Sequence, residues 1–375
     1  MIINNAKVYR NGHFESASIE FDSHIRSFSP GEGMDACGAY IIPGLIDVHT
    51  HGAMGIDASD CTAEQIHHLA QFYSDNGVTS FCFTTLTVPA DELRGAMKNI
   101  RAYERFGGEA KCAGVHLEGP FVSRGKCGAQ NPDNIRKPDI ALFNELNELS
   151  GGIVRLITVA PEVEGALEFI REASKVCTVS LGHSTADYDQ AMAGFEAGAT
   201  HVTHLFNGME PFHHRKPGLV GAALTAGANV ELICDGVHIH PAMIVAVHKM
   251  FGDRLIIVSD SLRCAGLCDG RYNLGGLPMI VRDGRATLLD GTIAGSSSNL
   301  LQELRNVVSY GVPLEAAVKA ATETPAKDIG VFDSIGSLEV SKCADFLVLN
   351  KDLKLMATFI DGKLVNGTTD FESVK

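Results

Sequence analysis

The sequence lacks the marks of a secreted or membrane-bound protein. No uncharged stretch reaches the length needed to span a bilayer, and the start has neither the basic region nor the long apolar core of a signal peptide. The ten cysteines include no Cys-x-x-Cys pair, and Cys264 and Cys268, which come closest, have a weak spacing. Most cysteines lie in apolar runs, where a free thiol behaves as a small hydrophobic side chain. We therefore expect a cytoplasmic protein with reduced thiols.

Positive charge is also scarce. The chain has 31 lysine and arginine residues against 45 aspartate and glutamate residues, a formal net charge of −14. Binding to nucleic acid or to an anionic membrane needs a basic face, so we expect neither as a partner. A small anionic metabolite is still compatible with this charge, because His213, His214, Arg215 and Lys216 form a compact basic cluster. A guanidinium suits bidentate phosphate binding; the alternative is a solvated loop.

A Gly-x-Gly-x-x-Gly motif is absent after the first apolar run, which argues against a doubly wound nucleotide-binding sheet. The middle of the chain instead alternates regularly. Eight apolar runs have the character of buried strands, at 41–48, 79–83, 113–117, 154–159, 178–181, 201–204, 230–234 and 255–259. Helix-like stretches lie between them, at 62–76, 91–106, 139–149, 164–175, 186–197 and 241–251. This alternation predicts an α/β fold, a (β/α)8 TIM-like barrel with its chemistry at the carboxyl ends of the strands.

Both ends of the chain follow a different pattern. Residues 1–40 alternate short β-like runs with Asn-Gly and Gly-Glu-Gly turns, and similar runs return at 346–349 and 357–365. We expect the two ends to pair into one small β-sandwich domain, made of residues 1–40 plus 340–375. Residues 41–339 then form the catalytic barrel between them.

Ionisable side chains follow three of the predicted strands. Glu118 ends the third strand, and His183 and His204 come at the ends of the fifth and sixth. Two imidazoles and a carboxylate at strand ends are a donor set typical of a divalent cation. Each residue alone has a structural alternative, as a cap or as a satisfied core histidine. The three together favour a metal site.

The first and last strands add candidates of their own. His49 and His51 are two residues apart in a strand, so both side chains can face the barrel mouth. The last strand ends in Asp260, a candidate base, because water activated by a metal needs an acceptor for its proton. The alternative for Asp260 is an N-cap of the following turn.

The ordered set of motifs resembles the N-acetylglucosamine-6-phosphate deacetylase family of the amidohydrolase superfamily. The resemblance rests on the segments at 43–52, 116–121, 181–184, 203–209, 294–296, 336–340 and 344–346. It implies a metal-dependent barrel with a small β domain from both termini, usually as a homodimer. It assigns Glu118, His183 and His204 to the main divalent cation, commonly Zn2+, and Asp260 to catalysis. Members with His-x-His can hold a second cation, which makes His49 and His51 conditional ligands.

The resemblance also implies a sugar-phosphate site. The residues that match its pattern are Ala129, Gln130, Asn207, Gly208, Arg215, His238, Ile293, Ala294 and Gly295. Arg215 is expected to reach the phosphate held by the neighbouring subunit of a homodimer. Gln130 departs from the family pattern, because many relatives have there a histidine that orients the acetyl carbonyl; glutamine can donate an N–H but cannot carry a proton. Gly208 replaces a more usual alanine. We expect these changes to affect substrate preference rather than reaction class.

The reaction implied is metal-dependent hydrolysis of the acetamide of N-acetyl-D-glucosamine 6-phosphate to D-glucosamine 6-phosphate and acetate. Asp260 would take the proton of the attacking water and pass it to the amine, and Gln130 would help to hold the oxyanion. One alternative is the same reaction on the galactosamine epimer, and another is a non-catalytic homologue that binds a sugar phosphate. A hydantoinase or dihydroorotase is disfavoured, because such enzymes use a modified lysine on the fourth strand and residues 158–162 contain none.

Overall fold

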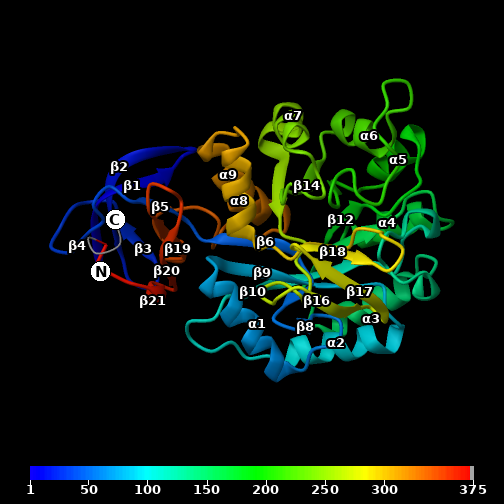
Figure 1. Cartoon of the computed structure of the whole chain (residues 1–375), viewed down its shortest axis with the longest axis horizontal. Helices are drawn as coiled ribbons and strands as arrows, with labels where there is room; N and C mark the ends of the chain where they lie inside the picture. Colours follow the sequence, from blue (N-terminus) through cyan, green and yellow to red (C-terminus); the bar gives the residue numbers. More distant parts are fainter. Residues whose placement is uncertain (372–375) are drawn as a thin grey trace.

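The computed structural model describes residues 1–371, and its larger part is a parallel barrel of eight strands (Figure 1). In barrel order the strands are β6 (Leu45–Thr50), β9 (Val78–Thr85), β10 (Lys111–Glu118), β11 (Val154–Val159), β12 (Thr178–Leu181), β13 (His201–Val202), β14 (Asn229–Ile233) and β15 (Leu255–Val258). Hydrogen bonds join the end of the last strand to the first: for example, the Asp260 N–H donates to the His49 carbonyl (2.9 Å), and the Ser259 hydroxyl donates to the Asp47 carboxylate (2.6 Å). The predicted TIM-like barrel is confirmed.

Helices alternate with these strands. They are α1 (Ala63–Asp75), α2 (Ala90–Ala102), α3 (Ile140–Leu149), α4 (Ala166–Ala173), α5 (Tyr188–Glu196), α6 (Gly218–Ala226), α7 (Pro241–Phe251), α8 (Leu300–Ser309), α9 (Leu314–Ala321) and α10 (Glu323–Asp328). Thr62 and Gln65 form a capping box at the start of α1. Helix α2 is shorter than predicted, because Tyr103 is already extended (φ −71°, ψ 121°). Within residues 1–371, none of the helices has both the length and the apolarity needed to cross a membrane.

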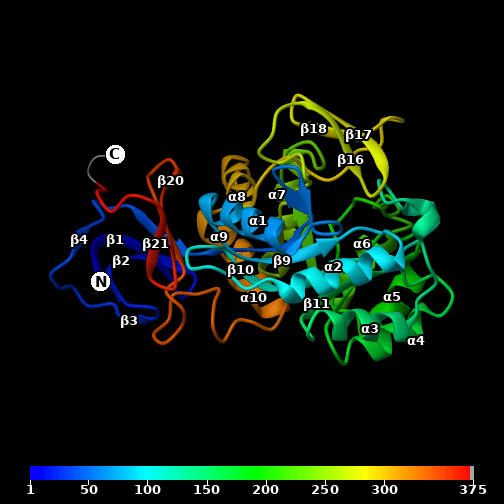
Figure 2. The ribbon, with the colours of Figure 1, turned by 90° about the horizontal axis from the view of Figure 1, so that it is seen from below.

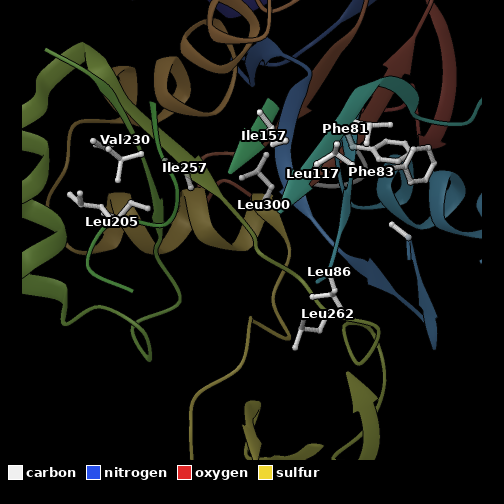
Figure 3. Close-up of a cluster of buried hydrophobic side chains, with 14 of the residues drawn as sticks. Phe81, Phe83, Leu86, Leu117, Ile157, Leu205, Val230, Ile257, Leu262 and Leu300 are labelled. Atoms are coloured by element: carbon white, nitrogen blue, oxygen red, sulfur yellow. The ribbon is translucent and has the colours of Figure 1, made fainter. Parts of the chain in front are cut away.

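The strands are buried on both faces, as expected of a parallel barrel covered by helices. All eight residues of β9 are buried. Figure 3 shows Phe81, Phe83 and Leu117 grouped on neighbouring strands, with Val230 and Ile257 across the barrel. This continuous apolar packing fixes the strand ends from which the site residues project.

Segments from near the two ends of the chain form one small β domain, beside the barrel in Figure 1. Its sheet runs in the order β21 (Lys363–Gly367), β20 (Leu355–Ile360), β19 (Phe346–Leu349), β5 (Tyr40–Pro43), β1 (Ile2–Arg10), β2 (His13–Phe21) and β3 (Ile25–Ser27), with β4 (Met34–Asp35) paired to β1. The Phe21 ring of β2 lies 5.5 Å from the Phe359 ring of β20, although three strands separate them in the sheet. The sheet therefore folds over on itself like a sandwich. The predicted pairing of the two ends is confirmed; residues 372–375 of that prediction lie outside the described residues.

The single strand predicted at 41–48 is wrong. Residues 40–43 form β5 in the small sheet and residues 45–50 form β6 in the barrel, with only Gly44 between them. A Cβ at Gly44 would lie 2.1 Å from the Thr79 hydroxyl oxygen, so the chain can pass β9 here only without a side chain. The exact division of the domains at residues 40 and 340 stays a prediction.

A small antiparallel sheet of three strands, here called the hairpin element, lies at the carboxyl ends of the barrel strands (Figure 2). Its strands are β16 (Gly270–Leu274), β17 (Leu277–Arg282) and β18 (Arg285–Leu288). The sequence signals for its turns, Gly275-Gly276 and Asp283-Gly284, have positive φ at all four residues, as type I′ hairpin turns require. We did not predict this element. A shorter pair, β7 (Gly52–Ala53) and β8 (Ile56–Asp57), follows β6.

Candidate active site

Glu118, His183 and His204 meet at the mouth of the barrel. The Oε1 atom of Glu118 lies 3.1 Å from Nε2 of His183 and 2.9 Å from Nε2 of His204, and the two Nε2 atoms are 3.1 Å apart. All three side chains are buried. His183 (φ 46°) and His204 (φ 27°) adopt left-handed backbone conformations, which are rare for residues other than glycine and are concentrated at functional sites. These predicted ligands therefore converge in the fold.

His49 and His51 lie beside this group. Nε2 of His51 is 3.2 Å from Oε2 of Glu118, and Nε2 of His49 is 3.4 Å from Oε1. Glu118 thus faces two pairs of histidines. His183 and His204 follow β12 and β13, and His49 and His51 come from the end of β6. Asp260, also left-handed (φ 46°), places Oδ1 3.2 Å from Nε2 of His51.

In three of these histidines, Nδ1 faces away from the site, and its hydrogen bond fixes the tautomer of the ring. Nδ1 of His183 lies 2.9 Å from the carbonyl oxygen of Lys126, and Nδ1 of His51 lies 3.1 Å from that of Thr84. Nδ1 of His49 lies 2.8 Å from a carboxylate oxygen of Glu231. Because carbonyl and carboxylate oxygens only accept, each Nδ1 carries the proton and each Nε2 can present a lone pair to the site.

This donor set fits a divalent cation. Two protonated Nε2 atoms 3.1 Å apart would repel each other, whereas Nε2 lone pairs and a carboxylate around one point are the ligands of a zinc-type site. Burial alone would raise the pKa of Glu118, but His49 and His183 outweigh it and hold the pKa of Glu118 well below its usual range. Burial also opposes ionisation of Asp260, yet His49 and His51 lower the pKa of Asp260. Both carboxylates are therefore ionised and able to bind a cation.

One pocket connects this cluster to most of the predicted substrate residues. It is lined by His51, Glu118, His183, His204 and Asp260, together with Ala129, Gln130, Asn207, Gly208, His238, Ile293, Ala294 and Gly295. Arg215 is the exception among the predicted substrate residues, and of the predicted ligands His49 does not line the pocket. The side chain of Arg215 is exposed, lies in a separate groove with Glu210 and Lys216, and contacts His214 (2.7 Å). A single chain therefore does not bring Arg215 to the pocket.

Gln130 is held by both ends of its amide. Its Oε1 accepts a hydrogen bond from the Thr87 backbone N–H (2.7 Å), and its Nε2 donates to Oε2 of Glu118. In this orientation one N–H of the Gln130 amide donates to the Glu118 carboxylate, and the other N–H is free to donate to a ligand in the pocket. The side chain that departs from the family pattern thus orients the central carboxylate.

The turn at 293–295, on another wall of the pocket, packs against Asp260. A Cβ added at Gly295 would lie 2.5 Å from the carbonyl oxygen of Asp260 and 2.9 Å from its Oδ1. His238 bonds Asp235 through Nδ1 (2.8 Å) and the Ala294 carbonyl through Nε2 (2.7 Å). Burial would lower the pKa of His238, but Asp235 outweighs burial and raises it. The turn at 293–295 is thereby fixed between His238 and Asp260.

Several residues of this region were missed from the sequence. Leu86, Gly128, Ile233, Leu262 and Thr292 line the pocket without having been predicted. Two more missed residues carry a part of the argument. Leu274 of the hairpin lines the pocket, and the Gly-Gly turn that follows it was an available signal. Glu231 lies below the pocket in the apolar strand β14 and is fully buried. An acidic residue inside a strand that is otherwise apolar is itself a signal, because glutamate is rarely buried without a partner.

Comparison with known proteins places the chain in a family. The family model described as "Amidohydrolase family" matches residues 40–365. An N-acetylglucosamine-6-phosphate deacetylase from Vibrio furnissii is 36% identical over 330 residues, covering 87% of this chain and 82% of the relative. An N-acetylgalactosamine-6-phosphate deacetylase from Escherichia coli is also 36% identical over 330 residues, covering 87% and 88%.

Solved structures agree. A mutant N-acetyl-D-glucosamine-6-phosphate deacetylase from Mycobacterium smegmatis, in complex with N-acetyl-D-glucosamine-6-phosphate, superimposes with a TM-score of 0.92 at 30% identity, over 98% of this chain and 99% of that chain. The Pasteurella multocida N-acetylglucosamine-6-phosphate deacetylase gives 0.90 at 29% identity, over 97% and 98%. The chain therefore belongs to the amidohydrolase family and, within it, to the N-acetylglucosamine-6-phosphate deacetylase family.

Proposed function

We propose that the chain is a metal-dependent deacetylase that hydrolyses N-acetyl-D-glucosamine 6-phosphate to D-glucosamine 6-phosphate and acetate. The observation that carries the proposal is the meeting of Glu118, His183 and His204 within 3.1 Å of one another, beside Asp260, in one pocket. The relatives named as deacetylases of this substrate, at 36% identity over most of the chain, support the choice of reaction.

Glu118, His183 and His204 would hold the main divalent cation, for which we propose Zn2+, and His49 and His51 would hold a second one with Glu118. When bound, such a cation lowers the pKa of water toward neutrality and polarises a carbonyl oxygen. Cytoplasmic location remains part of the proposal, since the cysteines are scattered without a paired spacing.

Asp260 is the proposed proton carrier. Its carboxylate lines the pocket, and the lowered pKa keeps it ionised, which a general base requires. It takes the proton of the attacking water and then gives it to the amide nitrogen, which must be protonated to leave as an amine. The free N–H of Gln130 is in position to donate to the oxygen that becomes negative at the acetyl carbon.

Binding of the sugar phosphate is assigned to the rest of the pocket wall, which includes Asn207, His238 and the turn at 293–295. We propose that Arg215 reaches the phosphate in the pocket of a second copy of the chain, because its guanidinium is exposed and outside its own pocket. The protein would then act as a homodimer.

Acetate release tests the proposal. Purified protein is supplied with N-acetylglucosamine 6-phosphate, its galactosamine epimer and unphosphorylated N-acetylglucosamine, before and after removal of metal by a chelator. We expect the highest kcat/KM on the first compound, loss of activity with the chelator and recovery with Zn2+. The E. coli relative is named as a deacetylase of N-acetylgalactosamine 6-phosphate, which makes this epimer the second candidate substrate. A higher kcat/KM on the epimer would make it the assigned substrate. Absence of acetate release from all three by metal-loaded protein would reject catalysis.

A further inference from the structure

A carboxylate that no substrate can reach lies beneath the histidines of the site. Glu231, in the middle of β14, has 0% exposure. Its Oε2 accepts hydrogen bonds from Nδ1 of His49 (2.8 Å) and from the backbone N–H of His204 (3.0 Å). One oxygen atom therefore contacts residues from both groups of proposed ligands.

A second pair of residues lies behind Glu231. Its other oxygen, Oε1, is 3.4 Å from Nε2 of His201, and Nδ1 of His201 is 2.6 Å from Oδ2 of Asp328 at the end of α10. Oδ1 of Asp328 accepts from the Asn229 amide (2.7 Å). Burial would lower the pKa of His201, but Asp328 and Glu231 outweigh it and raise the pKa of His201 to about 10. A charged imidazole therefore separates two buried carboxylates.

Burial of these charged side chains lowers the stability of the fold, and a role in the site would account for it. A buried carboxylate is costly even when paired, and an apolar side chain of similar volume is often as stable or more so. A carboxylate on the Nδ1 proton of a histidine fixes the tautomer and the orientation of the ring, and it makes Nε2 a better donor to a metal. Glu231 makes this contact with His49, and Glu231 itself does not line the pocket.

We infer that Glu231 is the positioning residue of His49: it holds the Nδ1 proton and directs the Nε2 lone pair at the site, and His201 with Asp328 holds Glu231 in place. This inference rests on the proposed metal-dependent function. It assigns Glu231 no contact with substrate. Its effect falls on the affinity for the cation on the His49 side.

The test is a titration of metal-free protein with Zn2+ against a chromophoric chelator, which measures the affinity for each cation without any turnover. We expect Glu231→Gln, which keeps an acceptor oxygen but loses the charge, to weaken one of two cations about tenfold, and Glu231→Met to weaken it about a hundredfold. His49→Asn should weaken binding of the same cation, because the variant loses the Nε2 ligand. In the double variant His49→Asn plus Glu231→Gln, the glutamine should cause no further loss, because its effect passes through His49.

Glu303→Gln is the matched control. Glu303, in α8, is also a glutamate with 0% exposure, but it does not line the pocket. It should leave both affinities unchanged, which separates positioning from the general effect of replacing a buried glutamate by glutamine. If Glu231→Met does not fold, Glu231→Gln still decides the question.

Three results would overturn the inference: wild-type affinities in Glu231→Gln, additive losses in the double variant, or no effect of His49→Asn on either cation. Failure of the proposed function is recognised separately. In that case the wild-type chain binds no cation, or binds cations normally but releases no acetate; in the second event the affinities still judge the role of Glu231.

Discussion

At the scale of single residues, Glu118 is the centre of the site. It faces His183 and His204 on one side and His49 and His51 on the other, and the amide of Gln130 orients it. The strand-end positions of Glu118 and the four histidines were predictable, because the carboxyl ends of parallel barrel strands converge. The contact of Glu231 with His49 was not, since 182 residues separate the two in sequence and nothing local relates them.

Gly295 gives a prediction at this scale. A methyl group at this position would overlap the carbonyl oxygen of Asp260, so Gly295→Ala must displace either the turn or the proposed proton carrier. A shift of about 1 Å in a catalytic group costs about a hundredfold in rate, and we expect a loss of that order in kcat with unchanged metal content. Gly95→Ala is the control, because a Cβ at Gly95 meets nothing within 4 Å. Wild-type kcat in Gly295→Ala would show that Asp260 tolerates movement.

At the scale of elements, the rhythm of apolar runs predicted the barrel because its strands are buried on both faces. The hairpin element was missed for the same reason: β16 alternates half-buried and exposed residues until Leu274, so it has no continuous apolar run. The division between β5 and β6 was hidden within one apolar stretch, and only the close approach at Gly44 separates them. The spacing of apolar runs in the sequence thus predicts the elements of the barrel wall better than those at its mouth.

The hairpin element has a testable role. Leu274 is buried where it lines the pocket, so Leu274→Ala should weaken substrate binding. We expect KM to rise about tenfold, the usual effect of a lost apolar contact in a pocket, with metal content unchanged. Leu289→Ala, just beyond β18, is the control because that side chain is 67% exposed. Equal KM values for the two variants would mean that the hairpin does not contribute to the site.

At the scale of the whole molecule, one lysine joins the barrel to the small domain. Lys111, at the start of β10, lies 2.7 Å from Asp345 and 2.6 Å from Asp361. Lys111→Met leaves Asp345 buried without its partner, for which the expected loss of stability is about 3 kcal/mol. Arg105→Met removes only the more exposed partner of Asp361 and should cost about 0.5 kcal/mol. Chemical denaturation followed by circular dichroism measures both; similar midpoints would contradict a special role of Lys111.

The proposed homodimer can be tested by mixing two inactive variants, Arg215→Ala and Asp260→Asn. In a mixed dimer, one pocket has an intact Asp260 and receives an intact Arg215 from the other chain. If half of the dimers are mixed after joint refolding, about a quarter of wild-type activity should return. Activity no higher than the sum of the separate variants would place Arg215 in its own pocket or outside the reaction.

The most direct test of the account is the metal content and the rate of acetate release of Asp260→Asn, both measured on the same sample. The asparagine keeps the size of the side chain but cannot take up a proton at neutral pH. We predict full metal occupancy and a kcat lowered at least about a hundredfold. A metal-loaded Asp260→Asn protein that keeps more than about a tenth of the wild-type rate would contradict the assignment of Asp260 as proton carrier.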